Sequence, residues 1–185
     1  VTLPLGSVII NEVDYDNDGS DAKEYVEILN PTGAPFDLSN YALIFINGET
    51  ATAPISGGRC DFSALPVDKR TLGATSYLVV GPTSLTVPGT VTKMDFALCT
   101  GSVKTQTNAV QNGQRDAVAL IERGNSAMSI APTVIDVITW EGHSSNFTLM
   151  IDGQSLTINP VEGTETTASD QGTGNGSLCR HPNGK

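Results

Sequence analysis

The sequence is poor in basic residues, poor in aromatic residues and free of long hydrophobic runs. Its 185 residues include ten Lys and Arg against 20 Asp and Glu, which gives a formal net charge of −10. Scattered basic residues offer no cationic stripe to phosphates, so we expect no nucleic-acid binding. No apolar run approaches the roughly 20 residues of a transmembrane helix, and we expect no membrane insertion. The chain starts at Val1 without a charged and then apolar leader, so we expect any signal peptide to have been removed.

The sequence also lacks the short motifs of common enzyme classes. It has no nucleophile elbow, phosphate-binding loop, zinc-ligand spacing or dinucleotide fingerprint. The two histidines, His143 and His181, lie far apart in sequence, so a hydrolase site would need them to converge in space. We therefore expect that the protein is not an enzyme.

Cysteines are few, and their number is odd. Cys60 is expected to sit in a Gly-Gly-Arg-Cys-Asp turn and Cys99 to end a strand-like segment, so a disulfide between them would close a long middle part of the chain. Two free buried thiols are an equally open alternative. Cys179 would remain free or pair elsewhere. A disulfide would favour an oxidising compartment.

Turn signals and short β-branched runs alternate along the whole chain. This pattern predicts an all-β fold with two packed antiparallel sheets, and 185 residues suit a single domain over residues 1–185. The Asp152-Gly153 pair predicts a tight hairpin. Residues 159–176, rich in Thr, Gly and Glu, are expected to form an irregular surface segment. Strands are expected at Ser7–Asp14, Glu24–Leu29, Tyr41–Asn47, Ser76–Val80, Lys93–Leu98, Ala117–Glu122, Val134–Trp140 and Ser155–Ile158.

An acidic turn between the first two expected strands is the main candidate site. Its clustered carboxylates repel one another unless solvent, salt or a cation compensates. The spacing matches the first half of a helix-loop-helix calcium loop, but the twelfth position is Tyr25 instead of a bidentate Glu. Calcium in a different oxygen cage and a merely hydrated turn both remain open. The candidate calcium ligands are Asp16, Asp18 and Asp21, together with Asp14 or Glu24 and a backbone carbonyl.

Three segments resemble the lamin tail domain family of the bacterial, secreted kind. Residues 11–31, which contain Asn11-Glu12-Val13 and Glu24-Tyr25-Val26-Glu27-Ile28, are similar to its opening strands. Asp37–Leu43 resembles its turn and third strand, and Ser177–Gly184 resembles its closing signature. The middle is matched only loosely, with an insertion around residues 48–115.

The resemblance implies an immunoglobulin-like antiparallel β-sandwich. It also implies a non-catalytic accessory or interaction module of a larger secreted or surface protein, located outside the cell or at its surface, with an unknown protein or surface partner. We expect a monomer as an isolated domain. The alternatives are a nucleic-acid or chromatin-binding domain and an accessory domain of a secreted nuclease or phosphatase.

Four residues are expected to have structural roles. Trp140 is the candidate large core residue. Glu24 and Glu27 should point to opposite faces of their strand because they lie three residues apart. Arg180 is expected to lie across a sheet face and pair with a core-edge carboxylate such as Glu24 or Glu27. One of these two glutamates is expected to face solvent, and the other to meet Arg180 or a free backbone amide at the sandwich edge.

Overall fold

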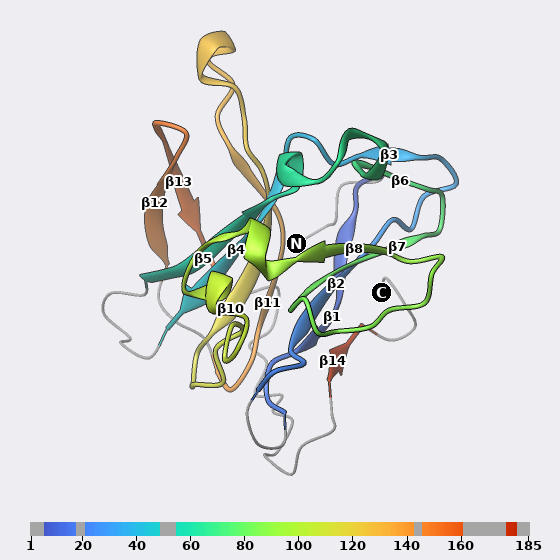
Figure 1. Ribbon diagram of the computed structural model, residues 1–185. Coiled ribbons are helices and arrows are strands. Elements are labelled where there is room, and N and C mark those ends of the chain that lie inside the picture. The colour runs from blue at the N-terminus through green and yellow to red at the C-terminus, as the bar shows by residue number, and fades with distance from the viewer. Residues whose placement is uncertain (1–5, 18–20, 49–54, 143–145, 161–176, 181–185) are drawn as a thin grey trace.

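The computed structural model describes residues 6–17, 21–48, 55–142, 146–160 and 177–180. Within these residues, two five-stranded sheets form a β-sandwich (Figure 1). The first sheet has the order β14-β1-β2-β7-β8, and the second has the order β11-β10-β4-β5-β9. The prediction of an all-β sandwich is therefore confirmed. No helix in the described part of the chain is long and apolar enough to cross a membrane.

The first sheet is antiparallel except at one edge. Its strands are β1 (Ile9–Asp14), β2 (Tyr25–Leu29), β7 (Tyr77–Gly81), β8 (Thr92–Asp95) and β14 (Leu178–Cys179). β7 and β8 run parallel, because residues 82–91 return the chain to the end of the sheet where β7 begins. Every other strand pair in the described part of the chain is antiparallel as predicted, and the β7–β8 pair is the exception. The expected strand Lys93–Leu98 also ends early, in a 3-10 turn over Phe96–Leu98.

The second sheet contains two strands, β5 and β9, that the sequence pattern did not predict. Its members are β4 (Tyr41–Asn47), β5 (Ile55–Asp61), β9 (Thr100–Gly101), β10 (Ala117–Glu122) and β11 (Thr133–Thr139). The Gly57-Gly58 pair, expected to form a turn, lies inside β5. A Cβ at Gly58 would lie 2.4 Å from the carbonyl oxygen of Thr100 and 2.5 Å from Cγ1 of Val103. Glycine is therefore required here by close approach of the neighbouring chain.

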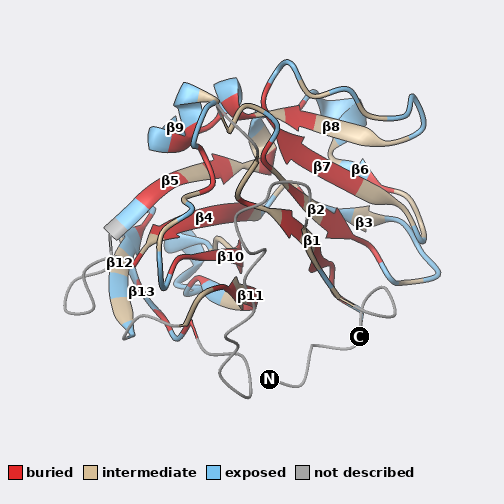
Figure 2. Cartoon of the chain, turned by 90° about the horizontal axis from the view of Figure 1, so that it is seen from below, coloured by how far each residue is buried: buried red, intermediate tan, exposed pale blue. Residues whose placement is uncertain are grey.

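The main core fills the space between the two sheets. Ile10 and Val26 of the first sheet and Leu43 and Phe45 of the second belong to this cluster, in which alternate residues along each strand point inward. Figure 2 shows buried residues along the strands of both sheets. Trp140 is fully buried in the cluster, where it stacks on the ring of Tyr15 with centroids 4.9 Å apart.

A hairpin forms a third layer over the outer face of the second sheet. It consists of β12 (Phe147–Ile151) and β13 (Gln154–Ile158), joined at Asp152-Gly153 as the sequence predicted. Both turn residues have positive φ, 49° and 82°. β12 was not among the expected strands, although the predicted hairpin implies a strand before Asp152. A second apolar cluster joins the hairpin residues Ile151, Leu156 and Ile158 to Ala42, Ile44, Ile46, Ala117, Ala119, Ile121 and Val137 of the sheet. β4 is thus apolar on both faces because both faces are covered.

Short elements complete the described chain. β3 (Phe36–Asp37) pairs with β6 (Thr71–Leu72) beside the sandwich. The remaining 3-10 turns are η1 (Phe62–Ala64), η2 (Val67–Lys69), η4 (Ser102–Thr105) and η5 (Ser126–Met128), and η3 is the turn over Phe96–Leu98 already described.

Candidate functional site

The acidic turn connects β1 to β2, and Asn17 organises its local hydrogen bonds. The Asn17 side chain donates to Oδ1 of Asp14 at 2.7 Å, and its backbone N–H donates to Oδ1 of Asp21 at 3.0 Å. Asp16 is half-buried beside them, and Asp18 lies outside the described residues. Among the described residues, no three Asp, Glu, His or Cys side chains are placed to hold a metal ion. Calcium binding here stays a prediction.

Glu24 lies inside the protein, where it binds backbone amides. Glu24 is only 1% exposed. Its Oε2 accepts hydrogen bonds from the N–H groups of Ala109 at 2.6 Å and Val110 at 3.1 Å. Oε1 is buried, and the described part of the chain provides it with no hydrogen-bond partner. Burial raises the pKa of Glu24 to about 8; the two amides oppose the rise, and the charges of Asp21 and Asp14 add to it.

A second buried carboxylate fixes the same loop. Asp116 accepts hydrogen bonds from the N–H groups of Gly48 at 2.7 Å and Gly113 at 3.0 Å. The indole N–H of Trp140 donates to the carbonyl of Gln111 at 3.2 Å. Residues 105–116 therefore pack against the acidic turn and the end of β11. The sequence carries no signal for the contacts of Glu24 with Ala109 and Val110 or of Asp116 with Gly48, because donor and acceptor lie 68 to 86 residues apart along the chain.

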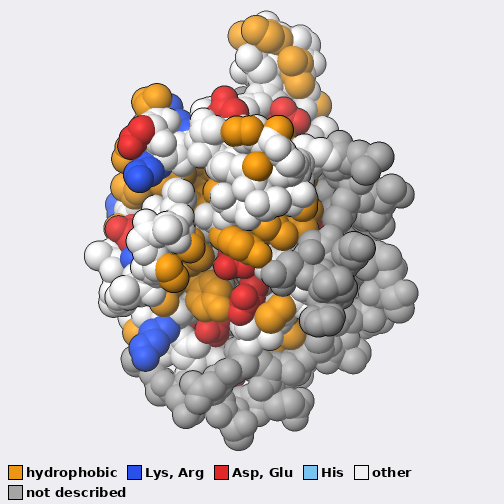
Figure 3. All heavy atoms as spheres, turned by 90° about the vertical axis from the view of Figure 1, so that its right-hand side faces the viewer, with side chains coloured by type: hydrophobic (Ala, Val, Ile, Leu, Met, Phe, Trp, Pro, Cys, Tyr) orange, Lys and Arg blue, Asp and Glu red, His pale blue; other side chains and the backbone are white. Residues whose placement is uncertain are grey.

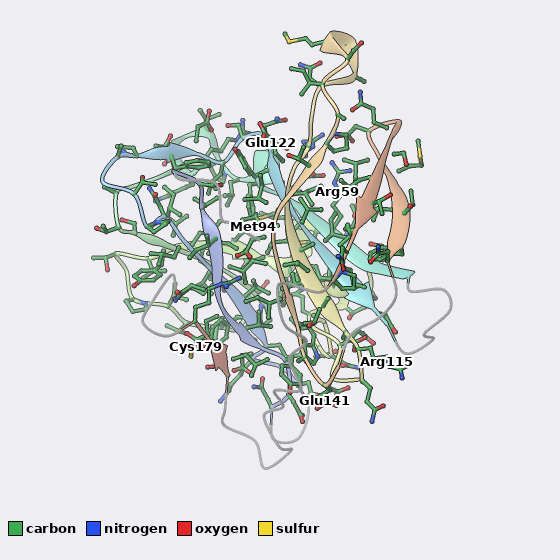
Figure 4. The ribbon with its side chains drawn as sticks, turned by 180° about the vertical axis from the view of Figure 1, so that it is seen from behind. Arg59, Met94, Arg115, Glu122, Glu141 and Cys179 are labelled. Carbon is green, nitrogen blue, oxygen red and sulfur yellow. A yellow bond between two sulfur atoms is a disulfide. The ribbon has the colours of Figure 1, made fainter. Side chains whose placement is uncertain are left out.

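Unusual backbone conformations occur at this end of the sandwich. Asp21, Asn108, Arg115 and Glu141 are non-glycine residues with positive φ, between 43° and 67°. Such conformations cost free energy and persist only where the surrounding structure enforces them. Figure 4 shows Arg115 and Glu141 close to this end and far from Glu122.

Glu27 lies on the outer face of the first sheet, opposite a carboxylate that the sequence analysis did not single out. β1 and β2 place Glu12 directly across from Glu27. The Tyr25 hydroxyl donates to Glu12 at 2.7 Å, the Ser177 hydroxyl also donates to Glu12, and the Asn11 amide donates to Glu27 at 2.8 Å. Burial raises the pKa of Glu27. The hydrogen bond from Asn11 lowers this pKa, and the charge of Glu12 raises it further. Figure 3, which faces the side where the first sheet lies, shows acidic side chains bordered by hydrophobic ones.

Arg180 binds a different partner from the one expected. Its Nη2 donates to Oδ1 of Asp136 at 2.6 Å, and its Nε donates to the carbonyl of Ile10 at 2.8 Å. Arg180 therefore pairs with a carboxylate, as expected, but the partner is Asp136 and the suggested partners Glu24 and Glu27 are wrong. Arg180 follows β14 at the edge of the first sheet, next to β1 and β11, whereas Glu24 faces residues 109–110 and Glu27 binds Asn11.

Cys60 and Cys99 form a disulfide, the pairing considered from the sequence. It joins β5 to the residue that follows the 3-10 turn after β8, and both residues are buried. The assignment of Cys60 to a turn is wrong, because Cys60 pairs with Leu43 inside the second sheet. Cys179 is an exposed free thiol on β14.

Comparison with known families identifies the fold. A family model described as Lamin Tail Domain matches residues 3–142, which is well over half of the chain. The chain belongs to the lamin tail domain family. Its members are non-enzymatic immunoglobulin-like domains, and membership indicates an interaction module. A search of the curated proteins found no match. The third-layer hairpin and β14 of this lamin tail domain lie beyond the matched residues.

The lamin tail domain also carries a projecting tip. The tip, residues 124–131, joins β10 to β11 and stands out from the body of the molecule (Figure 1). Asn125 and Ile130 exchange two backbone hydrogen bonds, of 2.7 and 2.9 Å, and the Asn125 side chain accepts from the N–H of Met128. Met128 is 70% exposed and Ile130 is 52% exposed. The sequence signal for an exposed apolar tip was the presence of these two large apolar residues in a segment of Gly, Asn and Ser.

Proposed function

We propose that this lamin tail domain is a non-catalytic interaction module of a larger exported or surface-displayed protein, and that the tip 124–131 contacts its partner. The observation that carries the proposal is the exposure of Met128 and Ile130 on a closed, projecting turn. Removing exposed Met and Ile side chains from water lowers the free energy, so a partner that covers them is favoured. The partner chemistry that fits is an apolar pocket on a protein.

The closed geometry of the tip supports binding. Gly124 has a φ of +73°, and a Cβ there would lie 2.5 Å from the carbonyl oxygen of Ile130. The N–H of Ser129 donates to Ser126, which adds a further internal bond. A segment whose backbone is already fixed loses less conformational entropy when it binds. The tip therefore presents its two apolar side chains at low entropic cost.

Size and charge favour a protein partner over a membrane or a nucleic acid. Complete burial of Met128 and Ile130 contributes roughly 1.5–3 kcal/mol each, which suits an anchor within a larger interface. The tip contains no aromatic or basic residue of the kind that holds a loop at a lipid surface. The net charge of −10 opposes both anionic lipid and phosphate.

Two features support an exported location. The Cys60–Cys99 disulfide suits an oxidising compartment. The resemblance of the opening and closing segments to lamin tail domains of bacterial secreted proteins points in the same direction. No catalytic role is part of the proposal. The carboxylates of Glu24 and Asp116 accept hydrogen bonds from backbone amides, and that of Glu27 accepts one from the Asn11 side chain.

A capture experiment tests the role of the tip. The immobilised domain is exposed to an extracellular fraction of the source organism, and the captured protein is identified, purified and titrated calorimetrically. The Met128→Ser/Ile130→Ser variant should bind this purified partner at least tenfold more weakly, with a smaller negative heat-capacity change.

Met150→Ser is the matched control, since Met150 is a comparably exposed methionine on β12, outside the tip. It should bind as the wild type does. Equal affinity of the tip variant and the wild type for every captured protein would overturn the proposed role.

A further inference from the structure

We draw no further inference here: the strongest candidate, the apolar tip of the β10–β11 hairpin with Met128 and Ile130, already carries the proposed function, and nothing in the structure shows what covers it.

Discussion

Arg180 and Asp136 lie 44 residues apart in sequence, and their side chains meet at 2.6 Å where the two sheets approach each other. The other carboxylate oxygen of Asp136 accepts from the N–H of Ile10 at 2.7 Å. One buried carboxylate therefore links β11 of the second sheet to β1 of the first and to the segment after β14. This contact joins the closing signature of the chain to its opening strand.

Replacing Arg180 with Met should strongly destabilise the fold. Asp136 has a fully buried side chain, and removing its cationic partner leaves a buried charge, which typically costs about 3–5 kcal/mol. Urea denaturation monitored by tryptophan fluorescence measures the loss. Lys93→Met is the control, because the Lys93–Asp95 pair is more exposed and should contribute about 1 kcal/mol or less. An Arg180 variant as stable as the control would contradict the assigned role.

Stability should fall as pH rises from about 5 to about 8. The folded-state pKa of Glu24 lies near 8, above its ordinary value, so the folded protein holds a proton that the unfolded chain has already released. The contribution of Glu24 is complete below the unfolded pKa and is lost as pH rises through the folded pKa. Denaturation at several pH values measures this slope.

Glu24→Gln should flatten that slope, since Gln keeps an oxygen that accepts from Ala109 and Val110 but does not titrate. Glu27→Gln is the comparison, because the pKa of Glu27 is raised as well and acts in the same direction. If the Glu24 variant retains the full wild-type slope between pH 5 and 8, Glu24 is ionised in the folded protein and the assignment is wrong.

Calcium should stabilise the domain if the acidic turn binds it. An ion that binds only the folded state adds roughly 2.7 kcal/mol at one hundred times its dissociation constant. Differential scanning calorimetry with calcium and with chelator should then show a shift that Asp16→Asn/Asp21→Asn removes. A hydrated turn gives the opposite outcome: no heat in a calcium titration, no change with chelator, and a variant at least as stable as the wild type.

The hairpin of the third layer should be necessary for stability. Leu156→Ala removes a buried side chain from the second apolar cluster and should cost about 2–5 kcal/mol. Met150→Ala on the exposed side of the hairpin should change stability little. Chemical denaturation of the two variants compares them directly. Similar stabilities would mean that the hairpin is not part of the cooperative folding unit.

The domain should show no measurable affinity for duplex DNA near physiological salt. Ten excess negative charges oppose phosphate, and counterion release has no basic cluster through which to act. Fluorescence anisotropy with a labelled duplex at micromolar protein tests this expectation. Salt-sensitive binding would revive the alternative of a nucleic-acid or chromatin-binding domain.

Strand periodicity predicted much of the sandwich. It failed where a glycine lies inside a strand because a neighbouring segment packs closely against it. Tyr41–Asn47 and Ala117–Glu122 were expected with the bounds that the structure shows, because β-branched and apolar residues run between clear turn signals. β5 was missed because Gly57 and Gly58 read as a turn. Gly58 is required by the close approach of Thr100 and Val103, which the local sequence does not encode.

Side-chain partners were harder to predict than strands. Glu24 sits next to the acidic turn in sequence and was grouped with it, yet its carboxylate faces the amides of Ala109 and Val110, 85 and 86 residues away. The partners of Asp136 were equally hard to predict. Asp136 is an acidic residue among the apolar residues of β11. Its isolation was a visible anomaly, but only the packing of β1 against β11 identifies Ile10 and Arg180 as its partners.

The pairing of β14 with β1 determines how the domain would respond to mechanical tension within a longer polypeptide. These strands are antiparallel neighbours, with Glu12 opposite Cys179 and Val13 opposite Leu178. Pulling on the chain before β1 and after β14 therefore loads the same end of both strands and peels them apart one residue pair at a time. β14 is only two residues long, so the load would fall first on Arg180, whose backbone N–H donates to the carbonyl of Asn11 and whose side chain binds Asp136.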